Sequence, residues 1–363
     1  MEHAFGTSEP FTLGIEEELL LVDRETRRLA PVAAEVLAAM DAPERAASHE
    51  VYAASIELRS PPRLDAEDAA RELATLRAAA RNAGATLIGT GVHPAGELGD
   101  VPLIDKPRYR LVGGAMRGLI RRTPECALHV HIGMPDPDTA IRVFNGIRSY
   151  LPLLLALSAN SPLWFGQDSG LASARFALVR SYPRRAVPRA FEDLDDYGST
   201  IAAVAEAGDL SDYTYVWWDV RLHPRLGTIE LRELDAQSRI ADATAIGALV
   251  QALARHLAED ARAPEPSEAI SESSFRASRD GVEATLLDDG ALRPVRDIAR
   301  RTLDEISPVA RELGGEAALS GIERLLEESG GAGRQRDALA DGGIEAVLEM
   351  LVEDTAQASE HPQ

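Results

Sequence analysis

Five segments of the chain alternate apolar and ionisable residues with a period of two. In the first, G-I-E-E-E-L-L-L-V-D (residues 14–23), Glu16 and Glu18 fall on one face of the predicted strand and Glu17 falls on the other. Side chains of a strand point alternately to its two faces, so residues two apart share a face. We therefore predict that Glu16 and Glu18 act together. We expect Glu17, on the apolar face, to be structural and to tolerate replacement by an apolar residue.

The other four segments follow the same plan, with apolar residues on one face and two ionisable residues on the other. They are S-I-E-L-R-S, A-L-H-V-H-I-G, W-W-D-V-R-L and T-I-E-L-R-E-L. Their ionisable pairs are Glu57 and Arg59, His129 and His131, Asp219 and Arg221, and Glu230 and Arg232. Polar faces of this kind meet water in an ordinary half-buried sheet. Such faces usually mix Thr, Ser, Lys and Gln, whereas these carry almost only Glu, Asp, His and Arg, which favours a functional surface.

Between the predicted strands, apolar residues recur every three to four positions, which predicts helices. Residues 65–83 begin with Asp and stop at Gly84, residues 136–162 read as one long buried helix, and residues 242–260 form another. Strands mixed with helices, including a hairpin around residues 223–227, indicate an α+β fold. The proline-containing stretch A-R-A-P-E-P-S-E (residues 261–268) is the best candidate for a boundary between two regions of the chain. We predict a catalytic sheet domain over residues 1–262 and a mainly helical region over 263–363 that packs on the same domain.

Composition narrows the possible partners. The 363-residue chain has a formal net charge of -21, which disfavours nucleic acid and anionic membranes as partners. It has no apolar run of membrane-spanning length and no secretion signal at its start, so we expect a cytoplasmic protein. Its single cysteine, Cys126, is expected to be a buried apolar residue rather than a nucleophile.

A concave surface formed by the polar faces would crowd several carboxylates together. Glu16, Glu18, Glu57 and Glu230 would raise one another's pKa unless a cation lay between them. Carboxylates with an occasional His suit Mg²⁺ or Mn²⁺ better than zinc. Arg59, Arg221 and Arg232 nearby suit a polyphosphate and a transferring phosphoryl group. The sequence has neither G-x-x-x-x-G-K-[ST] nor a G-x-G-x-x-G after a strand, so the sheet itself would have to bind the nucleotide.

Five ordered motifs resemble a known family. G-I-E-E-E-L-L-L-V-D, G-V-H-P, H-V-H-I-G, A-L-S-A-N-S-P and G-T-I-E-L-R-E-L-D look like the carboxylate–amine ligase group of bacterial glutamate–cysteine ligases, the YbdK-like or type 2 group, over about residues 8–350. The resemblance implies a glutamine-synthetase-like, curved and mostly antiparallel sheet with helices on its outer side. It also implies ATP and two or three Mg²⁺ ions on the concave face, and suggests a homodimer. The reaction would convert the γ-carboxylate of glutamate to an acyl phosphate, which an amine such as that of cysteine then attacks.

The resemblance also implies roles for particular residues. Arg232 would stabilise the transferred phosphoryl group, and His129 or His131 would serve a metal or a phosphate unless both are structural. The implied metal ligands are Glu16, Glu18, Glu57 and Glu230. Glu50 is a further candidate, and the alternative is that it simply begins a strand. Arg276 and Arg279 loosely match a segment that approaches the nucleotide. Arg175 and Arg180 are candidates to hold the substrate carboxylate, with ordinary structural arginines as the alternative. The base that takes a proton from the amine is not identified.

Two other classes of protein compete with a ligase. A metal-dependent amidohydrolase also begins with H-x-H, but only His223, His256 and His361 follow, in a turn, a helix and the tail. A nucleotide- and metal-binding protein without turnover would keep the sheet, although the intact acidic set argues against it. For the ligase, we expect Glu57→Gln and Glu230→Gln to abolish turnover and to leave the fold largely intact.

Overall fold

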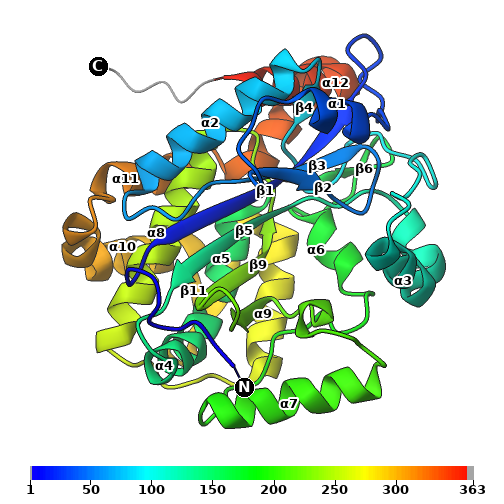
Figure 1. The fold of residues 1–363 in the computed structure, drawn as a ribbon. Coiled ribbons are helices and arrows are strands. Elements are labelled where there is room, and N and C mark those ends of the chain that lie inside the picture. The colour runs from blue at the N-terminus through cyan, green and yellow to red at the C-terminus, as the bar shows by residue number, and fades with distance from the viewer. Residues whose placement is uncertain (1, 358–363) are drawn as a thin grey trace.

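A seven-stranded antiparallel sheet forms the centre of the molecule, which a computed structural model describes over residues 2–357. The strand order is β2-β3-β1-β5-β9-β8, with β4 paired to the end of β1 (Figure 1). The strands are β1 (Leu13–Val22), β2 (Ala47–His49), β3 (Ser55–Arg59), β4 (Thr86–Ile88), β5 (Ala127–Gly133), β8 (Val220–His223) and β9 (Thr228–Asp235). Two small hairpins, β6 (Leu163–Trp164) with β7 (Gln167–Asp168) and β10 (Thr285–Asp288) with β11 (Ala291–Pro294), lie outside the sheet. The predicted α+β class is confirmed.

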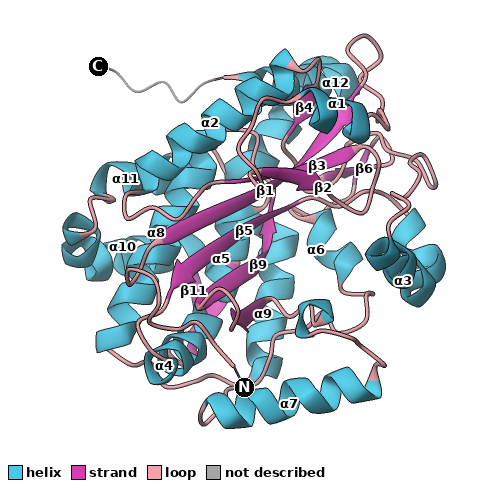
Figure 2. Cartoon of the chain, in the orientation of Figure 1, coloured by secondary structure: helices cyan, strands magenta, loops and turns pink. Residues whose placement is uncertain are grey.

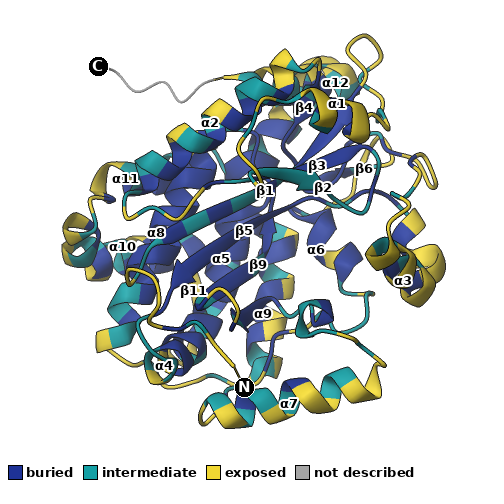
Figure 3. Ribbon diagram, in the orientation of Figure 1, coloured by how far each residue is buried: buried dark blue, intermediate teal, exposed yellow. Residues whose placement is uncertain are grey.

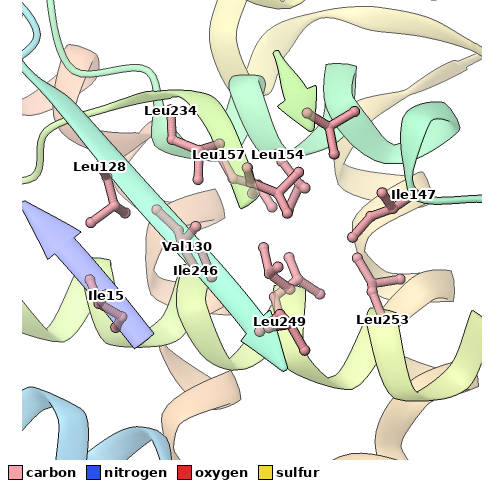
Figure 4. Packing of buried hydrophobic residues seen from close by; sticks show 14 of the residues in the cluster. Ile15, Leu128, Val130, Ile147, Leu154, Leu157, Leu234, Ile246, Leu249 and Leu253 are labelled. Atoms are coloured by element: carbon pink, nitrogen blue, oxygen red, sulfur yellow. The ribbon is translucent and has the colours of Figure 1, made fainter. Parts of the chain in front are cut away.

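Helices cover the apolar face of the sheet (Figure 2). The helices are α1 (Ala33–Ala39), α2 (Ala66–Asn82), α3 (Pro107–Met116), α4 (Pro137–Ile147), α5 (Leu151–Ser158), α6 (Ala174–Val179), α7 (Leu194–Ala207), α8 (Ile240–Glu259), α9 (Ser267–Asp280), α10 (Val295–Glu312), α11 (Glu316–Glu327) and α12 (Gly330–Ala356). Helix α8 packs on β1 and β5, and α5 packs on β9. Figure 4 shows Ile15 and Val130 of the strands facing Ile246 and Leu249 of α8. The apolar residues of the alternating strands thus form the core.

The predicted long helix over residues 136–162 is interrupted. Helices α4 and α5 are joined by a short 3-10 turn, and Pro152 stands in the first turn of α5. Proline has no amide hydrogen for the bond to the fourth residue before it, so a continuous helix cannot pass this point unbroken. The stretch Pro137–Ser158 is long and apolar enough to cross a membrane by composition, but 83% of its most apolar window is buried inside the fold. It is a core segment.

The described residues after 262 pack on the rest of the chain. Helix α9 lies against α5, α10 and α11 lie against α8, and α12 lies against β4. This region is mainly helical, as predicted, although the sequence pattern gave no sign of the hairpin β10–β11. Gly342 and Gly343 have non-helical backbone angles, so α12 is kinked at these residues. The division of the chain at residue 262 stays a prediction.

Glu17 is structural, as expected, but its role is that of a buried counter-ion. Figure 3 shows β1 banded between buried and intermediate residues, and Glu17 is among the fully buried ones. Its carboxylate accepts two hydrogen bonds from Arg77 of α2, at 2.9 and 2.6 Å. The structure contradicts the expectation that Glu17 tolerates apolar replacement, because such a change would leave a buried guanidinium without its counter-ion.

Candidate active site

The polar faces of five strands gather around one cavity of about 740 Å³. Strand pairing explains why they meet. Glu16 lies opposite Arg59 on β3 and His129 on β5, and Glu18 lies opposite Glu57. Farther along the sheet, Glu230 of β9 lies opposite both His131 and Arg221. The predicted site residues that line the cavity are Glu16, Glu18, Glu50, Glu57, Arg59, His129, His131, Arg175, Arg221, Glu230 and Arg232.

Two groups of side chains in this cavity have the geometry to hold cations. Glu16, Glu57 and His129 form one group and Glu18, Glu50 and Glu57 form the other, and within each group one potential ligand atom per residue lies within 4.8 Å of the others. Glu57 belongs to both. The donors are mostly carboxylates, which suit a hard divalent cation. In addition, buried His129 Nδ1 and His131 Nε2 make no hydrogen bond and lie 3.5 and 3.7 Å from the Glu16 carboxylate, so both ring nitrogens face the acidic group.

Two carboxylates of these groups, Glu50 and Glu16, have shifted pKa values. Burial and, to a smaller extent, the neighbouring charge of Glu18 together raise the pKa of Glu50 to about 8, against weaker lowering effects. Burial also opposes ionisation of Glu16, but His131 and His129 beside it lower its pKa well below the usual value. The opposite shifts show a site in which not every carboxylate keeps its charge without an added cation.

Glu230 lies outside both groups and acts as the counter-ion of two arginines. Its carboxylate, 1% exposed, accepts from Arg221 at 2.5 Å and also pairs with Arg232. Burial would raise the pKa of Glu230, but Arg221 and Arg232 lower it well below the usual range. In this structure Glu230 therefore holds the two guanidinium groups, and its role as a metal ligand stays a prediction.

Arg175 lines the cavity, but its guanidinium also donates to the main-chain oxygens of Glu233 and Arg232. Its Nε is buried and makes no hydrogen bond, so one donor remains for a ligand. Arg180 does not line the cavity and donates to Asp219 at 2.7 Å, which favours the alternative that it is a structural arginine. Asp219 itself is fully buried ahead of β8, so the alternating face of that strand does not extend to it.

Arg276 and Arg279 are also placed away from the cavity, against their prediction as nucleotide ligands. Both belong to α9, which packs on α5, and α5 in turn packs on the apolar face of β9. Arg276 donates to Thr285, and Arg279 pairs with its neighbour Asp280. Neither side chain lines the cavity, although the main-chain oxygen of Arg279 accepts a hydrogen bond from Ala172, three residues before the cavity residue Arg175.

Several cavity residues were missed by the sequence analysis. Most stand on loops or helix ends, where no periodicity marks them: Tyr52, Tyr109, Glu125, Tyr182, Arg185 and Trp217. His223 could have been found, because it ends β8 two residues after Arg221 and so shares its face. Its ring lies 5.9 Å from that of His131, and burial lowers its pKa to about 4. His256 is on α8, and His361 lies outside the described residues. No candidate metal group among the described residues contains more than one histidine, which disfavours the amidohydrolase.

Comparisons with known proteins identify the family. The model of glutamate-cysteine ligase family 2 matches residues 12–354. A Rubrobacter xylanophilus protein named "Putative glutamate--cysteine ligase 2-3" is 40% identical over 365 residues, which cover 98% of this chain and 100% of the relative. A Gloeobacter violaceus protein named "Putative glutamate--cysteine ligase 2" is 36% identical over 347 residues, covering 92% and 93%. The solved glutamate–cysteine ligase of Francisella tularensis in complex with AMP shares the fold, with a TM-score of 0.73 at 14% identity, over 97% of this chain and 90% of that one. The chain therefore belongs to glutamate-cysteine ligase family 2 and is a ligase that forms a carbon–nitrogen bond.

Proposed function

We propose that the protein uses ATP to convert the γ-carboxylate of glutamate to an acyl phosphate and joins it to the amine of an amino acid, as a glutamate–cysteine ligase does. The observation that carries the proposal is that two groups able to hold a metal ion converge in one cavity with the guanidinium groups of Arg59, Arg221 and Arg232. Phosphoryl transfer depends mainly on positioning and on charge stabilisation, and carboxylate-held metal ions and guanidinium groups supply both. The family membership and the AMP-bound neighbour of the same fold agree with it.

The residues present fit two divalent cations. Glu16, Glu57 and His129 would hold one, and Glu18, Glu50 and Glu57 the other. Bound Mg²⁺ would offset the charge of the triphosphate and of the phosphoryl group in transfer. Without a cation, the Arg59 guanidinium neutralises part of this site, since it lies 3.3 Å from Glu16 and also pairs with Glu57.

The chain's own polar groups would position the phosphates and the substrates. Glu230 fixes Arg221 and Arg232, so both guanidinium groups reach the cavity without further ordering. His131 is fixed by the contact of its Nδ1 with the Thr228 hydroxyl at 3.0 Å, which leaves Nε2 for a phosphate oxygen. His129, by contrast, belongs to a metal group, which gives the two histidines separate roles.

A second cavity of about 600 Å³ offers a place for the nucleotide base. It adjoins the first, because Glu16, Arg59 and His131 line both. The rest of its lining includes the apolar side chains of Ala46, Pro61, Pro62 and Leu76. The more apolar second cavity would hold the base of ATP, and the charged first cavity would hold its phosphates.

The proposal is tested by ADP release from the purified protein with Mg²⁺ and ATP, over a matrix of carboxylic acids against amines. Activity is expected with glutamate as the acid. If the protein binds Mg²⁺ and ATP but no pair of substrates releases ADP, it is a binding protein without turnover. Amide hydrolysis without ATP would instead support the amidohydrolase.

Glu50 gives a prediction about metal binding. Because its pKa is about 8, the Glu50 carboxyl is mostly protonated at pH 7 in the metal-free protein. A carboxyl must lose its proton to become a ligand, so Mg²⁺ binding at pH 7 should release about one proton, and the affinity for Mg²⁺ should rise as the pH approaches 8. Titration calorimetry in two buffers of different ionisation enthalpy measures the proton release. Glu50→Gln should remove it, and equal release by both proteins would contradict this assignment.

A further inference from the structure

Glu125 stands apart from the other carboxylates of the cavity. The two metal groups use Glu16, Glu18, Glu50 and Glu57. Glu230 and Asp212 lie outside these groups, but each is paired with an arginine. Glu125 instead lies between two tyrosine hydroxyls, with Tyr182 Oη at 2.5 Å from Oε1 and Tyr52 Oη at 3.0 Å from Oε2. It is half-buried just before β5, and it lines the cavity with both tyrosines.

Glu125 can gain or lose a proton without losing its hydrogen-bond partners. Tyr52 Oη lies 2.8 Å from the main-chain oxygen of Ile120 as well as 3.0 Å from Glu125, and a hydroxyl has only one hydrogen to donate. When Glu125 is ionised, both tyrosines can donate to it. When Oε2 is protonated, it can donate to Tyr52, which then turns its own hydrogen to Ile120. Both protonation states are therefore satisfied after the rotation of one hydroxyl.

The surroundings of Glu125 also bring its two protonation states close in free energy at neutral pH. Burial raises its pKa to about 7, against the lowering effect of the hydrogen bonds from Tyr182 and Tyr52 and of the charges of Arg122 and Arg175. A group that exchanges a proton in catalysis works best when its pKa is near the working pH.

The proposed ligation needs such a group. An amino acid carries its amine as an ammonium ion at neutral pH, and an ammonium nitrogen has no electron pair with which to attack. Glu125 lies near the second metal group, because the amide of Ala127, two residues along the chain, donates to Glu18 of that group at 2.7 Å. A half-buried carboxylate beside tyrosine hydroxyls also attracts a cation.

We propose that Glu125 binds the ammonium group of the incoming amine substrate and accepts its proton, with Tyr52 and Tyr182 as positioning residues. This inference rests on the proposed ligase function. The proton passes from nitrogen to Glu125, and the freed electron pair forms the bond to the acyl carbon. The bond from that carbon to the phosphate oxygen then breaks, and the phosphate leaves with its electron pair. The second proton of the nitrogen leaves with the phosphate.

Hydroxylamine separates this role from a structural one. It is largely unprotonated at neutral pH, so it can attack an acyl phosphate without a base and gives a hydroxamate. In Glu125→Gln, which keeps the size of the side chain and can hydrogen-bond to the tyrosines, we expect ligation of amino acids at saturating Mg²⁺ to fall by about 10²–10⁴-fold. Hydroxamate formation by the same variant should stay close to wild type.

The pH profile gives a second readout. Wild-type ligation of amino acids should rise through a pH of about 7 as Glu125 ionises, and this rise should be absent from Glu125→Gln. Tyr182→Phe keeps the carboxylate but removes a hydrogen bond that favours its ionised form, so the rise should move to higher pH. An unmoved profile in both variants would overturn the proposal.

The outcomes distinguish the two levels of inference. If wild-type protein forms neither amide nor hydroxamate, the ligase proposal itself fails. If wild-type protein forms both and Glu125→Gln loses both to the same extent, Glu125 is structural and the base assignment is overturned. Full amino acid ligation by Glu125→Gln also overturns it, whereas selective loss of amino acid ligation supports it.

Discussion

Glu57→Gln is expected to lower the kcat/KM of amide formation by roughly a thousandfold or more, because Glu57 is shared by both metal groups and metal ions supply several kcal/mol of charge stabilisation in such reactions. Stability should not fall with activity. Glu57 lies among the potential ligand atoms of Glu16, Glu18 and Glu50, so removing its charge relieves repulsion in the metal-free protein. Its arginine partner, Arg59, is 31% exposed and can be hydrated when the pair is lost. The measurements are ADP release and the midpoint of urea unfolding.

Glu230→Gln is the contrasting variant. This variant should also lose turnover. From the sequence alone we expect it to leave the fold largely intact, but the structure leads us to expect that it unfolds more easily than wild type. The side chains of its partners, Arg221 and Arg232, are only 7% and 15% exposed. Breaking such a pair leaves uncompensated buried charge, which costs about 3–5 kcal/mol. Equal stability of the two variants would show that Glu230 is not a buried counter-ion. High activity of both variants would show that this cavity is not the active site.

The sequence could predict the part of the site that is carried by regular strands. A period of two separates cavity-facing from core-facing residues, and antiparallel pairing places Glu16 beside His129 and Arg59. The alternation fails where a strand is irregular. The register between β5 and β9 shifts between Leu128 and Val130, so β9 contains one extra residue, and Leu231 and Leu234 both belong to the core although they are three apart. Glu233, inside that irregularity, is fully buried.

Residues outside the strands could not be placed from the sequence. Tyr52, Glu125 and Tyr182 meet in space from segments separated by 73 and 57 positions in the chain. Their meeting depends on the path of the loops, which no local pattern encodes. For the same reason, Arg175 and Arg180 looked equivalent in the sequence, although one lines the cavity and the other pairs with Asp219.

Glu17→Leu is expected to destabilise the protein by about 3–5 kcal/mol, although leucine matches the apolar face on which Glu17 lies. The side chains of Glu17 and Arg77 are 1% and 2% exposed. Arg77 also donates to the main-chain oxygens of Gln237 and Ser238, just before α8. Removing Glu17 leaves this guanidinium buried with neutral acceptors only. The midpoint of urea unfolding measures the loss.

A double-mutant cycle separates the charge from the volume change. Arg77→Met fills much of the same space without a charge, so Glu17→Leu combined with Arg77→Met should be more stable than Glu17→Leu alone, since replacing both members of a buried ion pair by apolar residues is often neutral. Glu17→Gln, which keeps a hydrogen-bond acceptor, should fall between wild type and Glu17→Leu. If Glu17→Leu unfolds at the wild-type midpoint, the ion pair contributes nothing and the apolar face of β1 alone decides the packing. If the double variant is no more stable than the single one, the loss comes from the shape of leucine rather than from the unpaired charge of Arg77.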